Sequence, residues 1–450
     1  MTASGSVVPQ HLVLVLPSTG EFDSRTYRIA TACVARGHRV TVMARHRTGL
    51  PWREDHPAGF TLIRVLASAE DGMPLRPLVH AGRVAMRRLA SAIRARRTPS
   101  TGTPGGAASS PVRARGGSLL ERAWTGLYRR AGIPLQIRSH RRNAMRDTPR
   151  GDLVHGMAFM GIPVALTIGR RDGVPVVYDA RDIHLEARNL ARMGRPARWM
   201  LGRTERDWAV AATRVLTVND AYADVLASRW PIERPFVVMN CSYRYTPPRP
   251  RERRFHDALG LPEHHKVVLY HGGLFPWRGI EQLIEAMRAV PDATLVLMGY
   301  GALEPELRAI EADPSTGGRV RVMAAVPPAE LHDWIAAADV AAMPIQGDTL
   351  NHRLTTPNKL FEAMAAGVPA VVSDLPGMSA ILRDAESGML VDPTDVPAIA
   401  DAIRGIVSLP DEAWQAWRER CLAAAHERYN WETQVDRLLD LYTELTGKRW

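Results

Sequence analysis

The segment from Thr355 to Asp374, TTPNKLFEAMAAGVPAVVSD, has the residue types and spacing that predict the most specific chemistry in the chain. We expect Thr356 to cap a helix whose first helical residue is Pro357 and which ends at Gly367. The first turn of such a helix presents free N–H groups and the positive end of the helix dipole, and both favour phosphate. The segment therefore predicts a diphosphate site at the helix start.

Three side chains on this helix fit a nucleotide diphosphate. Lys359 adds a positive charge beside the helix start, and Asn358 lies four residues before Glu362, so these two share one face. A carboxylate at Glu362 can accept two hydrogen bonds from a ribose diol. The alternative for Glu362 and for Lys359 is an exposed helix position with no ligand. We favour ligand binding for Glu362 and leave both interpretations open for Lys359.

A second candidate cluster follows an apolar strand predicted at residues 266–271. Gly272 and Gly273 form a turn after this strand, and Arg278 lies in the loop that follows. An arginine there can bind a phosphate through two parallel hydrogen bonds. The alternative is a solvated loop arginine, and we favour the phosphate contact.

These clusters need a scaffold that brings a glycine turn and a helix start together. Short apolar runs alternate with helical segments in two series, which indicates parallel sheets. A proline-rich stretch at 243–250 separates the series and has the composition of a linker. We predict an α/β fold with two doubly wound, Rossmann-like domains, 1–245 and 246–430, that face a central cleft. The predicted strands are 11–16, 39–43, 152–155, 174–179 and 214–219, then 266–271, 294–298, 319–323, 340–344 and 369–373.

A resemblance to a known family covers most of the chain outside residues 68–150. Residues 355–374 resemble the nucleotide-sugar signature of glycosyltransferase family 4, the group 1 glycosyltransferases with the GT-B fold. HGGLFPWRG at 271–279, RGHRVTV at 36–42 and YNWE at 429–432 are similar as well. The Pro-Asn-Lys sequence at 357–359 is similar to one branch of this family. The resemblance implies these donor-binding residues: Gly272, Gly273, Arg278, Thr356, Asn358, Lys359, Leu360 and Glu362.

The chain departs from the family pattern at two places. Family members commonly have two glutamates separated by seven residues; Glu362 matches the second, but Leu354 occupies the first position. Members also often have an arginine in the glycine turn and a lysine five residues later, where this chain has Gly273 and Arg278. The first glutamate contacts the donor sugar in the family, so positioning of the sugar is the property that these changes affect.

The resemblance implies transfer of a sugar from a nucleotide-diphosphate donor to a glycan, lipid-linked or small-molecule acceptor. Family 4 enzymes retain the anomeric configuration through same-face attack, in which the leaving phosphate helps to deprotonate the acceptor. Arg278 and Lys359 would stabilise the leaving diphosphate without a metal, and no Asp-x-Asp metal motif follows a strand. We expect no cofactor other than the nucleotide sugar as co-substrate.

The acceptor side is predicted in the amino-terminal half. Arg181 lies where family members often have an active-site histidine, and His184 is nearby, so both are candidate catalytic residues. The alternative is that Asp179 and Asp182 cap a following helix and pair with Arg181. The first loop, with Gly20, Asp23 and Arg25, resembles the family's acceptor and phosphate loop, although an ordinary turn is the alternative. We group these two loops as the acceptor or phosphate site.

The carboxy-terminal residues 431–450 are predicted to form a helix with Val435, Leu438, Leu439 and Tyr442 on one face. In the GT-B fold such a helix returns to pack on the amino-terminal domain. The two domains would then close over the donor.

The net charge of +11 comes from one segment. Between Arg76 and Arg146 there are 16 arginines and a single acidic residue, Glu121. Residues 68–150 are predicted to be a basic, partly flexible insertion, with helices at 79–97 and 119–146 around a loop at 98–117. The segment could dock on an anionic membrane surface, bind a polyanion, or be a solvated insertion. We favour membrane contact and expect no nucleic acid.

Three scattered cysteines give no disulfide framework, and no apolar run approaches the ~20 residues that span a bilayer. We predict a cytoplasmic protein that is peripheral at the inner face of the cell membrane. Two other functions stay open: a nucleotide-sugar epimerase or hydrolase of the same fold, and a non-catalytic nucleotide-sugar-binding scaffold.

Overall fold

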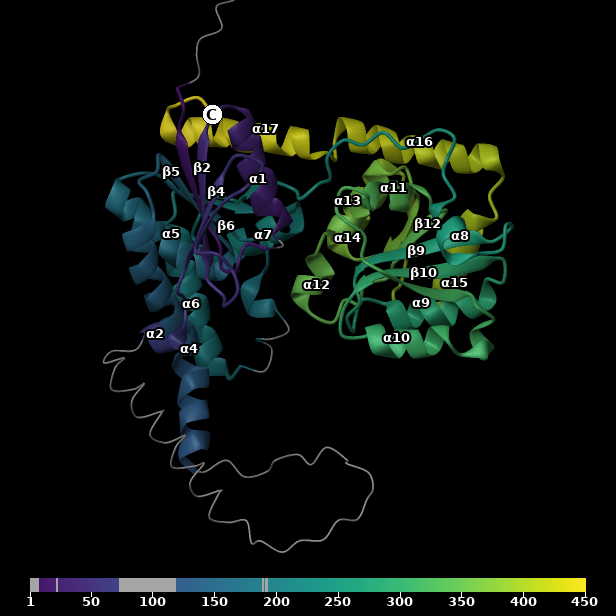
Figure 1. Cartoon of the computed structure of the whole chain (residues 1–450), viewed down its shortest axis with the longest axis horizontal. Coiled ribbons are helices and arrows are strands. Elements are labelled where there is room, and N and C mark those ends of the chain that lie inside the picture. The colour runs from purple at the N-terminus through teal and green to yellow at the C-terminus, as the bar shows by residue number, and fades with distance from the viewer. Residues whose placement is uncertain (1–7, 22, 73–118, 188–189, 191–192) are drawn as a thin grey trace, which may run out of the picture. The chain divides into compact units, whose positions relative to one another are not determined.

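The structure is a computed structural model that describes residues 8–21, 23–72, 119–187, 190 and 193–450. By their contacts these residues form two units, one from Pro9 to Val174 and one from Pro175 to Trp450. Figure 1 draws the helices and strands of the chain with their labels. Each unit is described by itself.

The unit Pro9–Val174 is built on a sheet of order β3-β4-β2-β1-β5. Parallel pairs join β1 (His11–Val15), β2 (Arg39–Arg45), β4 (Thr61–Val65) and β5 (Leu153–Met157), and β3 (Arg53–Asp55) is antiparallel to β4. Leu12 pairs with Val40 on one side and with Leu153 on the other. All five residues of β1 are buried, as its continuous apolar sequence predicts for a strand covered on both faces. The expected strands at 11–16, 39–43 and 152–155 are confirmed.

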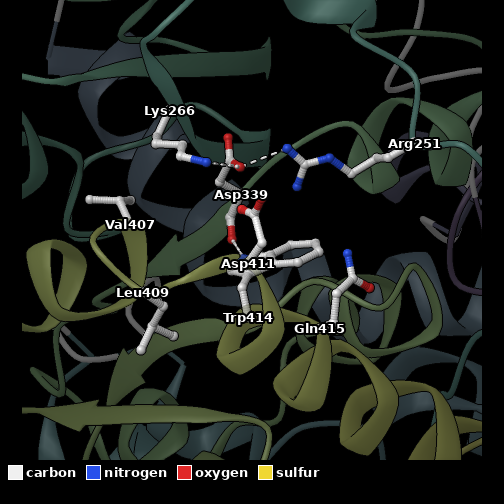
Figure 2. A pocket seen from close by; sticks show the side chains of 8 residues that line it. All are labelled: Arg251, Lys266, Asp339, Val407, Leu409, Asp411, Trp414 and Gln415. Atoms are coloured by element: carbon white, nitrogen blue, oxygen red, sulfur yellow. Dashed lines mark hydrogen bonds and ion pairs between the residues drawn. The ribbon is translucent and has the colours of Figure 1, made fainter.

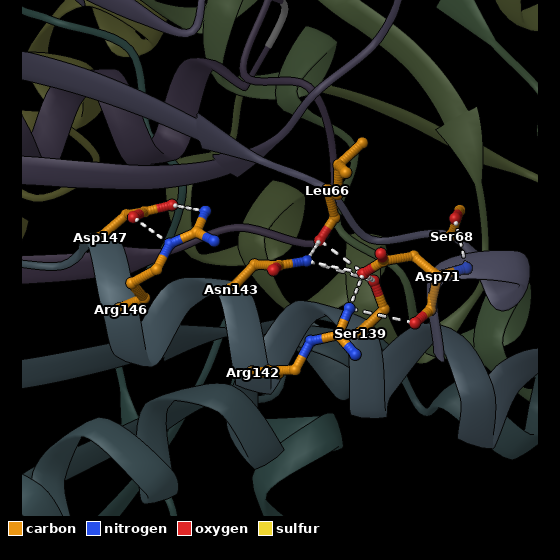
Figure 3. A network of polar contacts seen from close by, with 8 residues as sticks. All are labelled: Leu66, Ser68, Asp71, Ser139, Arg142, Asn143, Arg146 and Asp147. Atoms are coloured by element: carbon orange, nitrogen blue, oxygen red, sulfur yellow. Dashed lines mark hydrogen bonds and ion pairs between the residues drawn. The ribbon is translucent and has the colours of Figure 1, made fainter. Parts of the chain in front are cut away.

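The helices of this unit are α1 (Ser24–Ala35), α2 (Ala69–Gly72), α4 (Leu119–Asp147) and α5 (Ala158–Asp172). The expected helix at 119–146 is confirmed by α4, whereas the expected helix at 79–97 and loop at 98–117 lie outside the described residues. Asp71 connects α2 to the end of α4 (Figure 3). Its Oδ2 accepts hydrogen bonds from Ser139 at 2.7 Å, Asn143 at 2.8 Å and Arg142 at 2.6 Å. A buried carboxylate requires such donors, so the end of the basic segment is part of this unit's packing.

The unit Pro175–Trp450 begins with three parallel strands, β6 (Val176–Asp179), β7 (Arg214–Thr217) and β8 (Phe236–Val237). The connections contain the 3-10 helix η1 (His184–Glu186), α6 (Arg195–Ala211) and α7 (Asp220–Arg229). The expected strands at 174–179 and 214–219 are therefore present.

A six-stranded parallel sheet follows, with the order β11-β10-β9-β12-β13-β14. From β9 the chain runs outward to β10 and β11, then crosses to β12 on the other side of β9. This reversal is a topological switch point, and open α/β sheets bind ligands there, outside the carboxyl ends of the strands. The strands are β9 (Lys266–Gly273), β10 (Ala293–Tyr300), β11 (Val320–Ala324), β12 (Val340–Met343), β13 (Ala370–Ser373) and β14 (Gly388–Val391).

Two buried clusters of apolar side chains cover the two faces of this sheet. One joins the strands to α11 (Leu331–Ala336), α13 (Asn358–Ala365), α14 (Pro376–Ala385) and α16 (Asp411–Glu427). The other joins them to α9 (Ile280–Ala286), α10 (Glu304–Glu311) and α15 (Val396–Val407). Short elements complete the domain: α8 (Arg254–Leu259), α12 (Leu350–Leu354), η3 (Met287–Ala289) and η4 (Pro314–Thr316).

The last helix, α17 (Trp431–Thr446), packs on the segment that follows β8. Trp431 N donates to Ser242 O at 2.7 Å, and Gln434 Oε1 accepts from Met239 N at 3.0 Å. The face predicted from the apolar spacing is buried, with Leu438 and Tyr442 fully enclosed. Among the helices of the described residues, none combines the length and the apolar character that crossing a membrane requires.

The amino ends of β9 and β12 are joined by ion pairs around a cavity of about 230 Å³ (Figure 2). Asp339, just before β12, lies 2.7 Å from Arg251 Nη2 and 3.8 Å from Lys266 Nζ, and its Oδ2 accepts from Val267 N at 2.7 Å. The Arg251 guanidinium lies 4.6 Å from the centre of the Trp414 ring. Arg251 and Lys266 each have the Asp339 carboxylate beside them, so these ion pairs stabilise the domain without needing a ligand.

Candidate functional site

The loop that leaves β9 at the switch point is shaped by close backbone contacts. Gly272 has φ +107, and a Cβ on Gly299 of the neighbouring strand would lie 1.8 Å from Gly272 O. Gly279 has φ +78, and a Cβ there would lie 2.0 Å from Pro344 O. Only glycine fits these positions, so the loop from 272 to 279 is fixed against both neighbouring strands.

Lys359, in the first turn of α13, reaches across to this loop. Its Nζ lies 3.6 Å from the centre of the Tyr270 ring, and a Cβ built on Gly272 would be 3.7 Å from the same Nζ. Loss of hydration lowers the pKa of Lys359 to about 7; the charge of Arg278 also lowers it, and Glu362 opposes the shift. An ammonium held in this way is stabilised when an anion binds.

Arg278 is the second cation of the site. Neither Arg278 nor Lys359 has an ion pair or a hydrogen bond to any residue that the structure describes. They act on each other through space, since Arg278 is one of the charges that lower the pKa of Lys359. Two cations that form no ion pair with a described residue, at the carboxyl edge of a sheet, predict an anionic ligand.

Glu362 is held by a residue to which the sequence alone assigned no role. His271 Nε2 lies 2.9 Å from Glu362 Oε2, and their side chains are 3% and 15% exposed. His271 continues the face of β9 that carries Val267 and Leu269, which pack with α13 in one buried cluster. Strand alternation could have placed His271 on that face, but no local pattern indicates its partner 91 residues later.

The start of α13 differs in one detail from expectation. The prediction that Thr356 caps the helix is wrong: Pro357 is the N-cap, with an extended ψ of 141, and the first helical residue is Asn358. The Thr356 hydroxyl instead donates to Gly377 O at 2.6 Å and accepts from Asn219 at 2.9 Å. Gly367, with φ +71, follows the end of the helix as predicted.

Two further predicted donor residues also have structural contacts. Asn358 Oδ1 accepts a hydrogen bond from Asn240 at 2.8 Å. The Leu360 side chain is 1% exposed and lies in the apolar cluster under the sheet, so only its backbone is left for a ligand. The structure therefore brings together Gly272, Gly273, Arg278, Lys359 and Glu362 around the helix start.

Comparison with known proteins finds a family model that matches residues in the carboxy-terminal half of the chain. Residues 265–408, which hold the whole donor cluster, match the family model for "Glycosyl transferases group 1". This part of the chain is therefore similar to the group 1 glycosyltransferases.

Curated relatives agree with this family. A D-inositol 3-phosphate glycosyltransferase from Xylanimonas cellulosilytica is 30% identical over 214 residues, 46% of this chain and 49% of the relative. A protein of the same name from Acidothermus cellulolyticus is 28% identical over 334 residues, 69% of this chain and 70% of the relative. The match with the first thus spans about half of that relative's length.

Solved structures show that the chain has the GT-B fold, as predicted. Sucrose-phosphate synthase from Thermosynechococcus elongatus has a TM-score of 0.70 at 18% identity, covering 97% of this chain and 99% of that one. Anabaena HepE, solved in complex with UDP, has a TM-score of 0.65 at 16% identity, covering 97% of this chain and all of that one.

Leu354, which lies where the first glutamate of the family pair is expected, has an apolar environment in this structure. It is 8% exposed and clusters with Ile183 and Tyr222. Its carbonyl oxygen accepts a hydrogen bond from Asn219 at 2.7 Å. The residue therefore packs against the loop after β6, where a carboxylate would be desolvated at considerable cost.

Asp179 is the last residue of β6, Arg181 and Asp182 lie in the loop that follows, and His184 begins η1. Asp179 is fully buried, whereas Asp182 is exposed and accepts a hydrogen bond from Asn351 at 3.1 Å. Burial lowers the pKa of His184 to about 4, with Asp182 opposing, so the imidazole is neutral at neutral pH. The alternative that these aspartates cap the following helix is wrong, because η1 follows Ile183 and has no side-chain cap.

The loop with Gly20, Asp23 and Arg25 belongs to the other unit. Asp23 caps α1, with its carboxylate accepting from Thr26 N at 3.0 Å. Gly20 has φ +84 and its carbonyl accepts from the Tyr27 hydroxyl, while Arg25 is 2% exposed. These contacts are those of a structured turn before a helix. Within the part of the chain that the structure describes, no three His, Cys, Asp or Glu side chains are grouped to hold a metal.

Proposed function

We propose that this protein transfers a sugar from a nucleotide-diphosphate sugar, with retention of anomeric configuration and without a metal ion. One observation carries the proposal: Arg278 and Lys359 act on each other through space near the start of α13, and neither side chain has an ion pair or a hydrogen bond among the described residues. A diphosphate supplies the missing charge. The first N–H groups of α13 add a positive dipole at the same point.

The proposed chemistry uses these groups where charge develops. When the bond between sugar and phosphate breaks, negative charge grows on the diphosphate, and Arg278 and Lys359 stabilise it in place. The leaving phosphate then removes the proton of the acceptor hydroxyl on the same face of the sugar. No flanking pair of carboxylates is needed, unlike in glycosidases. Glu362, held by His271, accepts the ribose hydroxyls.

The names of similar proteins suggest donors and acceptors to test. HepE was solved with UDP-glucose, and a Mycolicibacterium smegmatis relative, 29% identical over 214 residues, is named a GDP-mannose-dependent phosphatidylinositol monomannoside mannosyltransferase. We therefore propose a uridine or guanosine diphosphate sugar as donor and a glycan, polyol phosphate or lipid-linked glycan as acceptor. Residence in the cytoplasm, peripheral to the inner face of the cell membrane, is part of the same proposal.

Calorimetry with UDP, GDP, ADP and dTDP, and with their sugar conjugates, tests the donor site. We expect one base to bind selectively in the presence of EDTA. Glu362→Ala should weaken binding at least tenfold, since a carboxylate with two ribose hydrogen bonds contributes about 1.5–3 kcal/mol per bond. Glu285→Ala, on the exposed side of α9, is the matched control and should bind like wild type. Failure of every nucleotide to bind, or strict dependence on a divalent ion, would contradict the proposal.

A second function is favoured by Leu354, whose burial removes a family sugar contact: a nucleotide-sugar-binding protein without transfer activity. It predicts tight donor binding and no glycoside product with any acceptor. Product analysis also separates an epimerase or hydrolase, which would yield an isomerised donor or free sugar.

The basic segment from Arg76 to Arg146 is proposed to contact anionic lipid. Flotation with phosphatidylglycerol vesicles at low salt measures this directly, with phosphatidylcholine vesicles as control. Each basic residue near the surface contributes about 1 kcal/mol, so binding should disappear at high salt.

A further inference from the structure

A cavity of about 590 Å³ opens at the loop that also carries Arg278 of the proposed donor site. Its walls come from three loops at the carboxyl edge of the sheet, those after β9, β12 and β14, and from the first turn of α9. Trp277, the residue before Arg278, forms one wall, and Thr394 after β14 forms another. This volume lies in the range of small-molecule sites.

The cavity is preformed by hydrogen bonds between its walls. Gln346 N donates to Trp277 O at 3.1 Å, and the Gln346 side chain donates to Pro344 O at 3.0 Å and to Pro393 O at 2.7 Å. One residue thus ties the loops after β9, β12 and β14 together. A site with fixed walls loses little entropy when it binds a ligand.

Trp277 is presented to the cavity at a conformational cost. Its φ is +65, a left-handed value that is unfavourable for a large side chain, and the side chain is 43% exposed. Strained residues of this kind persist where the surrounding structure holds them, and they concentrate at binding sites. An exposed indole offers a flat apolar face with one N–H donor at its edge.

The other lining groups set the chemistry of the ligand. They are carboxylates, carboxamides and a hydroxyl, supplied by Glu281, Asp348, Gln282, Gln346 and Thr394, and neither lysine nor arginine is among the residues around the cavity. The side-chain oxygen of Gln282 is buried and has no hydrogen-bond donor within the described residues. Such an arrangement is rich in acceptors, and it disfavours phosphate because two carboxylates would repel it.

We propose that this cavity binds a neutral saccharide unit of the acceptor. A pyranose ring has an apolar C–H face that packs on an indole, and a rim of hydroxyl groups that donate to carboxylate and amide oxygens. Turning the Gln282 amide into the cavity lets one of these hydroxyls satisfy its oxygen. The inference rests on the proposed transferase function and adds the acceptor class: a glycan chain rather than a lone polyol phosphate.

Saturation-transfer NMR on the full chain tests this proposal, with maltose, mannobiose and diacetylchitobiose as neutral probes and inositol phosphate as the anionic probe. We expect at least one neutral saccharide to bind, and Trp277→Asn to weaken it at least tenfold. Asparagine tolerates the left-handed backbone, so the loop keeps its shape. Trp277→Phe should recover part of the binding. Tyr300→Ala removes an exposed aromatic side chain outside the cavity and should have no effect.

A variant on the opposite wall of the cavity distinguishes two causes of weaker saccharide binding. One is loss of a direct contact with Trp277, and the other is a shift of the loop that carries Arg278. Thr394→Phe fills the cavity from an exposed loop remote in sequence from Arg278, and should weaken saccharide binding while nucleotide binding stays within twofold of wild type. The proposal is overturned if no neutral saccharide binds, if Trp277→Asn and Thr394→Phe bind like wild type, or if inositol phosphate competes for the cavity. If the wild-type protein binds no nucleotide, the donor site itself is refuted instead.

Discussion

The two ends of β9 and β12 carry charge in opposite ways. At the amino ends, Asp339 lies between Arg251 and Lys266, and its second oxygen accepts a backbone hydrogen bond (Figure 2). At the carboxyl ends, Lys359 and Arg278 have no ion pair or hydrogen bond to any described residue. The amino ends of β9 and β12 therefore hold ion-paired charges. The loop after β9 and the start of α13 hold two cations that have no ion pair among the described residues.

This difference distinguishes charges that stabilise the fold from charges that are available to bind a ligand. A buried carboxylate stabilises the native state only while all of its ion-pair and hydrogen-bond partners are present. A buried lysine whose pKa is lowered to about 7 destabilises the folded protein when it is charged. Such a residue is typical of a site where a bound anion offsets this destabilisation. Substitutions at the amino ends should change stability, and those at the carboxyl ends should change binding.

The largest expected effect is on stability, for Asp339→Ala. The Asp339 side chain is 4% exposed, so its removal leaves two cations without their partner and should lower the free energy of unfolding by about 3 kcal/mol. Urea unfolding of the purified protein measures this change. Asp411→Ala removes an exposed carboxylate of the same cavity and should cost less than about 1 kcal/mol. Nucleotide affinity of the folded Asp339→Ala protein should equal that of wild type, and a clear loss would break the contrast between the two ends.

Arg278→Ala should have the reverse profile. Donor kcat/KM should fall about 100-fold, because one charged donor to the leaving diphosphate is lost, while the urea midpoint stays within experimental error of wild type. Arg288→Ala, which removes an exposed arginine paired with Glu285, is the control for loss of positive charge in the same domain. A stability loss as large as that of Asp339→Ala, with activity retained, would assign Arg278 a structural role.

Most elements that position the site follow from local sequence. The apolar runs gave the parallel strands because a strand covered on both faces needs continuous apolar residues. The helix start at 357–359 and the stop at Gly367 were located within one residue by proline and glycine chemistry. The N-cap was misplaced because the Thr356 hydroxyl bonds to Gly377, a residue that approaches only through the tertiary fold.

The remaining features depend on pairs that are far apart in the chain. His271 contacts Glu362, and Lys359 lies over the ring of Tyr270. The residues of each pair are so far apart in the sequence that no helix or strand periodicity predicts the contact. Asp71 and its partners on α4 are likewise 68 to 72 residues apart (Figure 3). This packing could not be predicted from the basic composition of residues 76–146. A count of arginines does not distinguish those that form ion pairs within a fold from those that face solvent.

A pH dependence of donor affinity is expected from Lys359. With its pKa at about 7, the free protein loses this charge as pH rises from 6 to 8, and the bound diphosphate favours the protonated form. Affinity for a nucleotide sugar should therefore fall about tenfold over this range, with proton uptake on binding above pH 7. Calorimetry in two buffers of different ionisation enthalpy measures the uptake. Lys359→Arg stays charged and should bind with little pH dependence; an equal slope in both proteins would place the titrating group elsewhere.

The smallest expected effect is a change in nucleotide affinity, and it is tested on two histidines near opposite ends of β9. His271→Asn removes the hydrogen bond that orients Glu362, and should raise the Kd for the nucleotide about fivefold, since such a bond contributes about 1 kcal/mol. His265 bonds Thr294 at 3.0 Å at the amino ends, and His265→Asn should leave the Kd unchanged. Because both substitutions remove one imidazole, a shared cost in stability cancels in the comparison. In the background of Glu362→Ala, His271→Asn should add nothing further, since its only route to the donor is the carboxylate that has been removed. An additive loss in the double variant would show that His271 contacts the nucleotide itself.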